Sequence, residues 1–340
     1  MSALTFPRRP RGRLSPAKAA EYAEARAAFC AAILQIRASL DFSIGSRGWC
    51  YILEEHGLDK GDFDAAQKLI SDCRKSGELP LNICIEDDAR AFVNLERIDR
   101  TSPDDEAAAV LSYVSKAHLH YNPASFWDYQ TCYVQMLVEK VDLKSLFAPV
   151  CAEYAIPLAN ARGNADINSR AAMMQRFAER EAEGKRCILL YAGDHDPAGL
   201  RISDFLRKNL ADLSGATGWT PDRLVIDRFG LNADFIAANG LTWIENLETG
   251  SGARLDNPRH PDFAKSYVQD YLAQFGARKV EANALVIRPA AGRQLCRDAI
   301  LKYVDDADAL DEWQAATQAG QQAVAEAIAR RLEGFAGGAV

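Results

Sequence analysis

Two aspartates at the end of an apolar segment are the residues of this sequence best suited to chemistry. Asp194 and Asp196 are separated by one residue and follow the apolar run at residues 187–191. Such a run is typical of a strand buried on both faces of an α/β sheet, and ligands bind at the carboxyl ends of such strands. Two neighbouring carboxylates repel each other unless a cation neutralises them, and Mg²⁺ prefers oxygen ligands. The pattern therefore predicts a metal site, or alternatively an acidic turn that caps the helix beginning near Pro197.

A third carboxylate, Glu139, ends a second apolar segment at residues 133–138. The 55 positions from Glu139 to Asp194 leave room for two helices and one strand between them. We expect these helices at residues 142–154 and 167–182, the intervening strand at 156–161, and a further strand at 223–227. This alternation predicts a parallel sheet. Glu139, Asp194 and Asp196 are then expected at one edge of it, holding Mg²⁺ or Mn²⁺.

Four motifs resemble segments of the A subunit of topoisomerase VI and its relatives that make meiotic DNA double-strand breaks. They are V-E-K at 138–140, R-G-N-A-D-I-N-S-R at 162–170, G-D-H-D-P-A-G at 193–199 and K-V-E-A-N-A-L at 279–285. Their common order makes the resemblance more specific than any single motif. The resemblance implies a multidomain α/β and α+β chain in which a winged-helix domain precedes a Toprim domain with a parallel sheet. The chain looks like a free-standing, Mini-A-like member of this family.

The resemblance also assigns a nucleophile. The family carries a tyrosine four residues after an arginine on a winged-helix-domain helix, and S-R-G-W-C-Y-I-L at 46–53 places Arg47 and Tyr51 in this relation. An arginine beside a phenol favours the phenolate and can hold a phosphate. The alternative is that Tyr51 belongs to a small aromatic core. The chain departs from the family pattern at Cys50, where relatives carry another tyrosine, and at Gly48, where an acidic residue is frequent.

The expected DNA-binding surface is the helix at residues 62–76, which precedes the wing of a winged-helix domain. We expect helices at residues 17–40 and 62–76 and a β wing that starts at 79–85. The candidate DNA contacts on this helix are Gln67, Lys68, Arg74 and Lys75, and the Toprim segment adds Arg162 and Arg170. For the contacts on the helix, the alternative is an ordinary solvated helix face.

Four segments follow from these expectations. Residues 1–16 form a basic mobile arm that contacts phosphates or is a solubilising tail, residues 17–100 form the winged-helix domain, residues 101–130 form a linker, and residues 131–335 form the Toprim domain with C-terminal helices. The first segment is rich in arginine and proline, and the break at 102–105 marks the domain boundary.

The resemblance implies a magnesium-dependent DNA-cleaving transesterase, which is a topoisomerase-type isomerase activity. Tyr51 of one protomer would attack a backbone phosphate held at the metal site of the other, so that a homodimer leaves a double-strand break with 5′-phosphotyrosyl links. The implied partners are double-stranded DNA and a separately encoded ATPase B-type subunit. Two alternatives stay open: a Toprim nuclease that uses water, similar to the plasmid-cutting subunit of Wadjet-type defence systems, and a non-catalytic DNA- or partner-binding protein.

Composition limits the remaining classes. The chain has 340 residues and a net charge of −7, and residues 41–100 carry 13 acidic against 8 basic side chains. Affinity for DNA must therefore come from a local stripe or be weak and sensitive to salt. The eight cysteines include no C-x-x-C pair and are typical of reduced, buried thiols. Neither a signal peptide nor an apolar run of 18 residues is present. We therefore expect a cytoplasmic, nucleoid-associated protein.

Overall fold

The computed structural model describes residues 6–8, 10, 15–85, 101–161, 167–248 and 253–337, with side chains described up to residue 333. The chain divides into two compact units. Unit 1 comprises Met1–Glu86 and Val134–Lys302, and unit 2 comprises Asp87–Tyr133 and Tyr303–Val340. This division differs from the expected one. The predicted winged-helix and Toprim segments share a unit, and the predicted linker at 101–130 belongs with the C-terminal residues because it packs on them.

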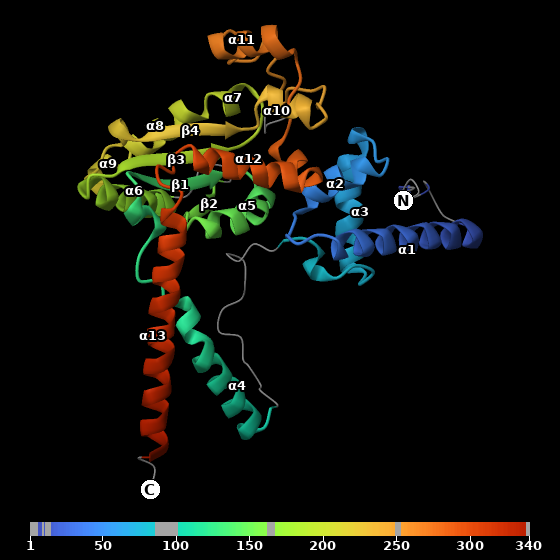
Figure 1. Cartoon of the computed structure of the whole chain (residues 1–340). Coiled ribbons are helices and arrows are strands. Elements are labelled where there is room, and N and C mark those ends of the chain that lie inside the picture. The colour runs from blue at the N-terminus through green and yellow to red at the C-terminus, as the bar shows by residue number, and fades with distance from the viewer. Residues whose placement is uncertain are drawn as a thin grey trace. The chain divides into compact units, whose positions relative to one another are not determined.

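A parallel four-stranded sheet forms the centre of unit 1 (Figure 1). The strands are β1 (Cys132–Val138), β2 (Leu158–Asn160), β3 (Arg186–Ala192) and β4 (Val225–Gly230), in the spatial order β2-β1-β3-β4. All residues of β1 are buried, as are all residues of β3 after Arg186, which is why both strands are largely apolar, with Gln135 the polar exception in β1. The predicted α/β class is confirmed, and each strand overlaps the range expected for it.

Helices cover both faces of the sheet. They are α5 (Val141–Glu153), α6 (Ile167–Ala182), α8 (Ile202–Ala211) and α12 (Pro289–Leu301). Helix α5 packs against α12, whereas α6 contacts β3 and α8. The chain runs from β1 out to β2 and then crosses in the opposite direction to β3 and β4, so right-handed crossovers put α5 and α6 on opposite faces. The reversal lies between the carboxyl ends of β1 and β3, the position at which α/β sheets of this kind bind ligands.

Three helices precede the sheet: α1 (Pro16–Ala38), α2 (Ser46–Glu55) and α3 (Phe63–Lys75). Their positions agree with the sequence prediction. Helix α2 contacts α3 and also the 3₁₀ helix η7 (Ala282–Ile287), which belongs to the segment between the sheet and α12. The apolar side of α2 is therefore covered from two directions, and its central residues are buried.

The expected wing is not a strand where the structure describes it. Leu81–Ile83 forms the 3₁₀ turn η2 directly after Pro80, and both Arg74 Nε and Nη2 donate to the Leu81 carbonyl, at 3.0 and 2.6 Å. The arginine holds the chain in a turn at residues 81–83, so the described residues at 79–85 do not form the expected strand. The continuation of the wing lies outside the described residues, and the winged helix stays a prediction.

Two described residues of the expected basic arm contact other parts of unit 1. The Phe6 ring packs edge-on against Phe29 of α1 with ring centroids 6.1 Å apart, and Arg8 forms an ion pair with Asp62. At these two positions the expected arm is therefore held against unit 1 and is not freely mobile. The other residues of the arm, apart from Pro7, Pro10, Ser15 and Pro16, lie outside the described residues.

The remaining elements of unit 1 are short connections. They are η1 (Lys60–Asp62), α7 (Pro197–Leu200), α9 (Ser214–Thr217), η6 (Pro221–Arg223), α10 (Ala233–Ala238) and α11 (Ser266–Phe275). Helix α7 begins directly after Asp196, within the acidic motif. The structure therefore joins the end of β3 to α8 through one turn of helix.

In the part of unit 2 that the structure describes, two helices and two 3₁₀ turns follow one another along the chain. These are α4 (Pro103–Lys116), η4 (Ala117–His120), η5 (Phe126–Tyr129) and α13 (Ala309–Gly337). Phe126 and Trp127 are fully buried, and Trp313 of α13 donates through Nε1 to the Ala124 carbonyl at 2.9 Å. The predicted helical C-terminal segment is confirmed, and its contact with η5 and α4 explains why residues 101–130 are not a free linker.

All eight cysteines are buried and none is in a disulfide, in agreement with the prediction of reduced thiols. They contribute small apolar side chains to the core. Within the described ranges, no helix has both the length and the apolar character that crossing a bilayer requires.

Candidate functional site

Glu139 and Asp194 converge on one cation at the edge of the sheet. Glu139 directly follows β1 and Asp194 lies just beyond β3, so the neighbouring strands bring both carboxylates to one place. The Lys140 Nζ lies between them, 2.7 Å from Glu139 Oε1 and 2.8 Å from Asp194 Oδ2. The two carboxylates that were expected to meet are thus brought together, with a lysine ammonium as their counterion.

The other oxygen of each carboxylate is held by a backbone amide. The Asp194 N–H donates to Glu139 Oε2 at 2.9 Å, and the Ala282 N–H donates to Asp194 Oδ1 at 2.8 Å. The Tyr191 hydroxyl, at the end of β3, also donates to Glu139 Oε2 at 3.4 Å. Fixed amide donors restrict the orientation of both carboxylates. Oxygens Glu139 Oε1 and Asp194 Oδ2 are consequently the pair that faces a cation.

Asp196 has a different local role. It is the N-cap of α7, and its Oδ1 accepts from the Gly199 N–H at 2.6 Å. The alternative expectation, that the acidic turn caps a helix, is therefore correct for Asp196 Oδ1. Asp196 also lines the same cavity as Glu139. Among the residues that the structure describes, no three His, Cys, Asp or Glu side chains are grouped so that they could hold a metal ion. A side chain at Gly199 would collide with the Asp194 carbonyl, which accounts for the glycine that ends the motif.

The charges of the group shift its pKa values in different directions. Burial, aided by the negative charge of Glu139, raises the pKa of Asp194 to about 7 against the opposing effect of Lys140. Burial also acts to raise the pKa of Glu139, but the charge of Lys140 and the Asp194 amide outweigh it, so the pKa is lowered. Burial likewise raises the pKa of Asp196. Glu139 therefore favours its charged form, whereas Asp194 takes up a proton more readily than an ordinary aspartate.

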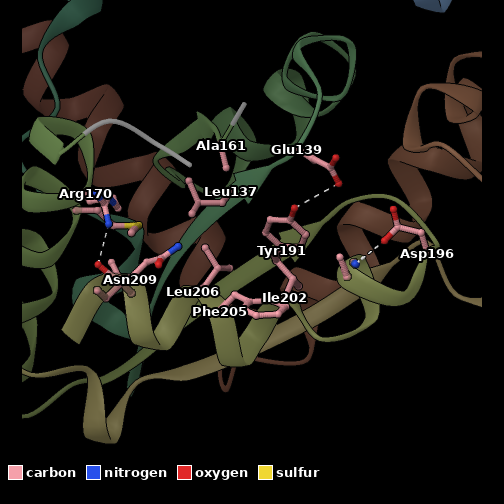
Figure 2. A pocket seen from close by; sticks show the side chains of 14 residues that line it. Leu137, Glu139, Ala161, Arg170, Tyr191, Asp196, Ile202, Phe205, Leu206 and Asn209 are labelled. Carbon is pink, nitrogen blue, oxygen red and sulfur yellow. Dashed lines mark hydrogen bonds between the residues drawn. The ribbon is translucent and has the colours of Figure 1, made fainter. Parts of the chain in front are cut away.

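A cavity of about 220 Å³ opens beside the acidic residues. In Figure 2, Glu139 and Tyr191 lie near Asp196, whereas Arg170 and Asn209 lie at the far end. The walls between are mainly apolar and include Leu137, Ala161, Met173, Ile202, Phe205 and Leu206. A water molecule occupies roughly 30 Å³ in the liquid, so the cavity has space for several.

The residues present fit a divalent metal once the ammonium has left. Mg²⁺ is usually bound through one or two carboxylates and keeps several waters. Glu139 and Asp194 supply two oxygens directed at one position, and the adjacent cavity has the room that bound waters need. Lys140 Nζ supplies one positive charge at that position. These observations support Glu139 and Asp194 as ligands more directly than Asp196.

Tyr51 and Arg47 lie on one face of α2, as the spacing predicts, and both bind Glu281. The Tyr51 hydroxyl donates to Glu281 Oε2 at 2.9 Å. Arg47 binds the same carboxylate with both nitrogens, Nε to Oε2 at 2.9 Å and Nη2 to Oε1 at 3.1 Å. Since the amide of the next residue, Ala282, donates to Asp194, the tyrosine and the acidic pair are connected through one short segment.

The environment of Tyr51 disfavours the phenolate. Its side chain is fully buried, and burial together with the negative charge of Glu281 raises its pKa above the usual value, against the opposing charge of Arg47. The Lys60 ammonium lies 4.8 Å from the centre of the Tyr51 ring. The prediction that Arg47 activates the phenol is therefore incomplete, because the arginine is neutralised by a carboxylate that binds the hydroxyl as well.

Asp142 replaces the missing cap of α2. The helix has no capping side chain of its own at Gly45. Instead the fully buried Asp142 carboxylate accepts from the amides of Gly45 and Gly48 and from the Asn283 side-chain amide. A Cβ atom at Gly48 would lie 2.6 Å from Asp142 Oδ2. This contact gives a physical reason for glycine at position 48.

The predicted DNA contacts on α3 differ in their exposure. Lys68 and Lys75 of α3 are exposed, with Lys75 3.7 Å from Asp72. Gln67 and Arg74 have partners within unit 1, since Gln67 Oε1 accepts from Ser46 Oγ at 3.3 Å and Arg74 holds the turn at Leu81.

Two further DNA contacts were predicted in the expected Toprim segment, and one of them is less accessible while the other is not described. The Arg170 Nη1 donates to the Asn209 carbonyl at 2.8 Å, and its buried Nε has no hydrogen-bond partner among the described residues. Arg170 lies on the wall of the cavity, away from the acidic end (Figure 2). Arg162 lies outside the described residues.

Sequence reasoning missed several residues that hold the site. Glu281 lies in the K-V-E-A-N-A-L motif, and an acidic residue among apolar neighbours was the available signal, because such a residue needs a partner. Arg228 of β4 gave no comparable signal. Its guanidinium donates to the carbonyls of Gly199 at 2.8 Å and Asp194 at 3.1 Å and so fixes the loop that carries the aspartates.

His195 points away from this chemistry. It is buried, and its ring contacts those of Trp243, Tyr271 and Phe275, with the closest centroid, that of Phe275, at 4.6 Å. Burial lowers its pKa to about 4, so the imidazole is neutral. The alternating directions along the D-H-D segment thus place the acids on one side and an aromatic cluster on the other.

Comparisons of the chain with protein-family models, curated proteins and solved structures gave no match. The relation to topoisomerase VI remains a resemblance of four motifs. Any assignment of function therefore depends on that resemblance together with the geometry of the acidic pair and of the α2 contacts.

Proposed function

We propose that this chain is a metal-dependent DNA-cleaving enzyme similar to the A subunit of topoisomerase VI, with its reaction centre at Glu139 and Asp194. One observation carries the proposal. The two carboxylates come from the ends of adjacent parallel strands and direct one oxygen each at a single cation position beside a cavity. Phosphodiester cleavage creates charge on phosphoryl and leaving oxygens, which is the charge that such a position can stabilise.

The ligands of the metal are Glu139 and Asp194, and Asp196 faces the same cavity, where it can accept hydrogen bonds from bound waters. A bound Mg²⁺ or Mn²⁺ supplies a Lewis acid that polarises a phosphoryl oxygen. The amides of Asp194 and Ala282 keep both carboxylates oriented, and Arg228 keeps the loop in place. Because the carboxylates are already oriented, no free energy is needed to reorient them during the reaction.

As the nucleophile we propose Tyr51, with Glu281 as its proton acceptor and Arg47 as a phosphate-binding group. The hydroxyl-to-carboxylate distance of 2.9 Å is within the reach of a general base. In the reaction the bond from Tyr51 Oη to phosphorus forms and the bond from phosphorus to the 3′ oxygen breaks. The tyrosine proton passes to Glu281, and the leaving 3′ oxygen takes a proton from water. Because Tyr51 is fully buried, attack requires its hydroxyl to become accessible to a phosphate.

A second function is favoured by the same burial. A Toprim-type nuclease would use water at the acidic pair, where the cavity has space for it, and would not require Tyr51 to become accessible. The raised pKa of Tyr51 also favours this reading, because a protonated phenol is a poor nucleophile. Both functions share the metal site and differ only in the attacking group.

The proposed partners follow from the resemblance. They are double-stranded DNA, a second copy of the chain that brings its tyrosine to this site, and a separately encoded ATPase B-type subunit. The exposed Lys68 and Lys75 offer phosphate contacts on α3. Such contacts supply affinity that depends on salt concentration rather than on DNA sequence.

The test mixes the full chain with supercoiled plasmid and Mg²⁺ or Mn²⁺, stops the reaction with a denaturing detergent, and examines the DNA ends. Wild type is compared with Tyr51→Phe and with Tyr113→Phe, which changes an exposed tyrosine of α4. Protein attached to 5′ ends in wild type and Tyr113→Phe, but not in Tyr51→Phe, supports the transesterase. Cut DNA with free ends in all three supports the nuclease, and uncut plasmid in every lane contradicts both.

A further inference from the structure

We propose that Lys140 is an internal counterion that occupies the metal position of the acidic pair and leaves it when a divalent cation binds. The inference rests on the proposed function, since the metal is the competitor of the lysine. It adds that the Lys140 ammonium lowers the affinity for metal below the affinity that the two carboxylates would have without it.

The argument begins with the four oxygens of the pair. Backbone amides hold Glu139 Oε2 and Asp194 Oδ1. Within the described residues, the two oxygens that no backbone amide binds are Glu139 Oε1 and Asp194 Oδ2, and these are the two that Lys140 Nζ contacts, at 2.7 and 2.8 Å. A metal held by both carboxylates needs the same two oxygens. Ammonium and metal therefore exclude each other at this position.

Electrostatics explains why the lysine is there without a metal. Two carboxylates that converge in a largely buried site repel each other and lose hydration, so a cation must offset their charge. The exposed fractions of the side chains are 26% for Glu139 and 11% for Asp194. The lysine supplies one positive charge from the residue next to Glu139, which requires no rearrangement of the backbone. A divalent ion supplies two charges and can replace it.

Lys140 can leave without disturbing the fold. Its side chain is 27% exposed, and the four-carbon chain of a lysine lets the ammonium reach solvent while its stem stays in place. Leaving costs the lysine its two carboxylate partners. That cost is subtracted from the binding free energy of the metal, so the affinity of the wild-type chain for metal is lower than that of a chain without the ammonium.

The first experiment measures the affinity for Mn²⁺ by isothermal titration calorimetry in wild type, Lys140→Met and Lys144→Met. Lys144 is an exposed lysine of α5 and serves as the matched control. We expect Lys140→Met to bind Mn²⁺ more tightly than wild type by roughly 5- to 150-fold, the usual range of coupling between two sites. Lys144→Met is expected to equal wild type. If Lys140→Met does not fold, Lys140→Gln replaces it with the same expectation.

Two other outcomes separate a failure of the counterion proposal from a failure of the metal site. If wild type binds Mn²⁺ and Lys140→Met binds it equally or more weakly, the counterion proposal is wrong while the metal site stands. If neither protein binds Mn²⁺, both the counterion proposal and the metal dependence of the proposed function are wrong.

A second experiment needs only wild type. The rate at which an amine-reactive acetylating reagent modifies Lys140 is measured by mass spectrometry with and without saturating Mg²⁺, with Lys144 as an internal reference. A lysine displaced into solvent reacts faster, so we expect Mg²⁺ to accelerate modification of Lys140 alone. An unchanged or slower rate at Lys140 in the metal-bound protein would overturn the proposal.

Discussion

The Tyr51 hydroxyl donates a hydrogen bond of 2.9 Å to the Glu281 carboxylate, although the two residues are 230 positions apart in the chain. This bond joins α2 to the segment whose next amide, that of Ala282, holds Asp194. Arg47 binds the same carboxylate from α2. The position of the proposed nucleophile and the orientation of a proposed metal ligand therefore depend on the same short segment.

Replacing Tyr51 by phenylalanine removes this bond and leaves the ring in place. A hydrogen bond to a charged acceptor contributes about 1.5–3 kcal/mol, so we expect Tyr51→Phe to lower the free energy of unfolding by that amount in urea denaturation. The matched control, Tyr113→Phe on the exposed surface of α4, is expected to change it by less than about 0.5 kcal/mol. Equal stabilities of the two variants would show that the bond contributes nothing.

Glu281 makes the stability of the protein depend on pH. Burial opposes its charge, but Arg47 and the Tyr51 hydroxyl outweigh burial and lower its pKa below the usual 4.5. A carboxylate whose pKa is lowered by folding stabilises the folded state above its unfolded pKa, and this contribution is lost as the pH falls through the folded pKa.

We therefore expect Glu281→Gln to be less stable than wild type at pH 7, with the difference shrinking as the pH drops below 4.5. Urea denaturation at a series of pH values measures this, with Glu312→Gln on the exposed face of α13 as the control. A difference that stays constant from pH 7 to pH 3 would contradict the assignment of the effect to the Glu281 charge.

The sequence predicted the sheet well because its central strands are apolar on both faces. The segments before Glu139 and Asp194 are largely hydrophobic, and the positions of the carboxylates just beyond them place both at one edge. Asp196 was harder to predict, since a helix cap and a metal ligand have the same sequence signature. The role of Lys140 could not be predicted from the V-E-K motif, because nothing local shows that its ammonium bridges residues 139 and 194.

Other features depend on contacts between distant segments. The pairing of residues 101–133 with the C-terminal helix has no local signal, so the predicted linker was placed by its composition alone. The turn at Leu81 is held by Arg74, a residue that the sequence reasoning had set aside for DNA. Glu281 was missed as a site residue for the same reason, since its partners lie on α2.

Gly48 offers a test of the contact between α2 and Asp142. A methyl group there would meet Asp142 Oδ2 at 2.6 Å, and overpacking of this kind costs about 1–3 kcal/mol. We expect Gly48→Ala to destabilise the protein by that amount in urea denaturation. The control is Gly215→Ala in α9, where the added atom meets nothing within 4 Å and the change is expected to be neutral or slightly stabilising. A neutral Gly48→Ala would mean that Asp142 does not hold the start of α2.

Lys68 and Lys75 offer a test of DNA binding by α3. Each phosphate contact that is lost reduces the slope of log affinity against log salt by about one. We expect the double variant Lys68→Ala with Lys75→Ala to bind duplex DNA more weakly and with a slope reduced by about two, measured by fluorescence anisotropy. Lys18→Ala, an exposed lysine of α1, is the control. An unchanged slope would exclude these lysines as phosphate contacts.

The central claim is that Glu139 and Asp194 form the reaction centre of a metal-dependent DNA-cleaving enzyme. Cleavage of supercoiled plasmid in Mn²⁺ by wild type, Glu139→Gln and Asp194→Asn tests it most directly, with Asp204→Asn on the exposed surface of α8 as the control. We expect both site variants to lose cleavage by about 100-fold or more, while the control keeps it. Full cleavage by either site variant would contradict the claim.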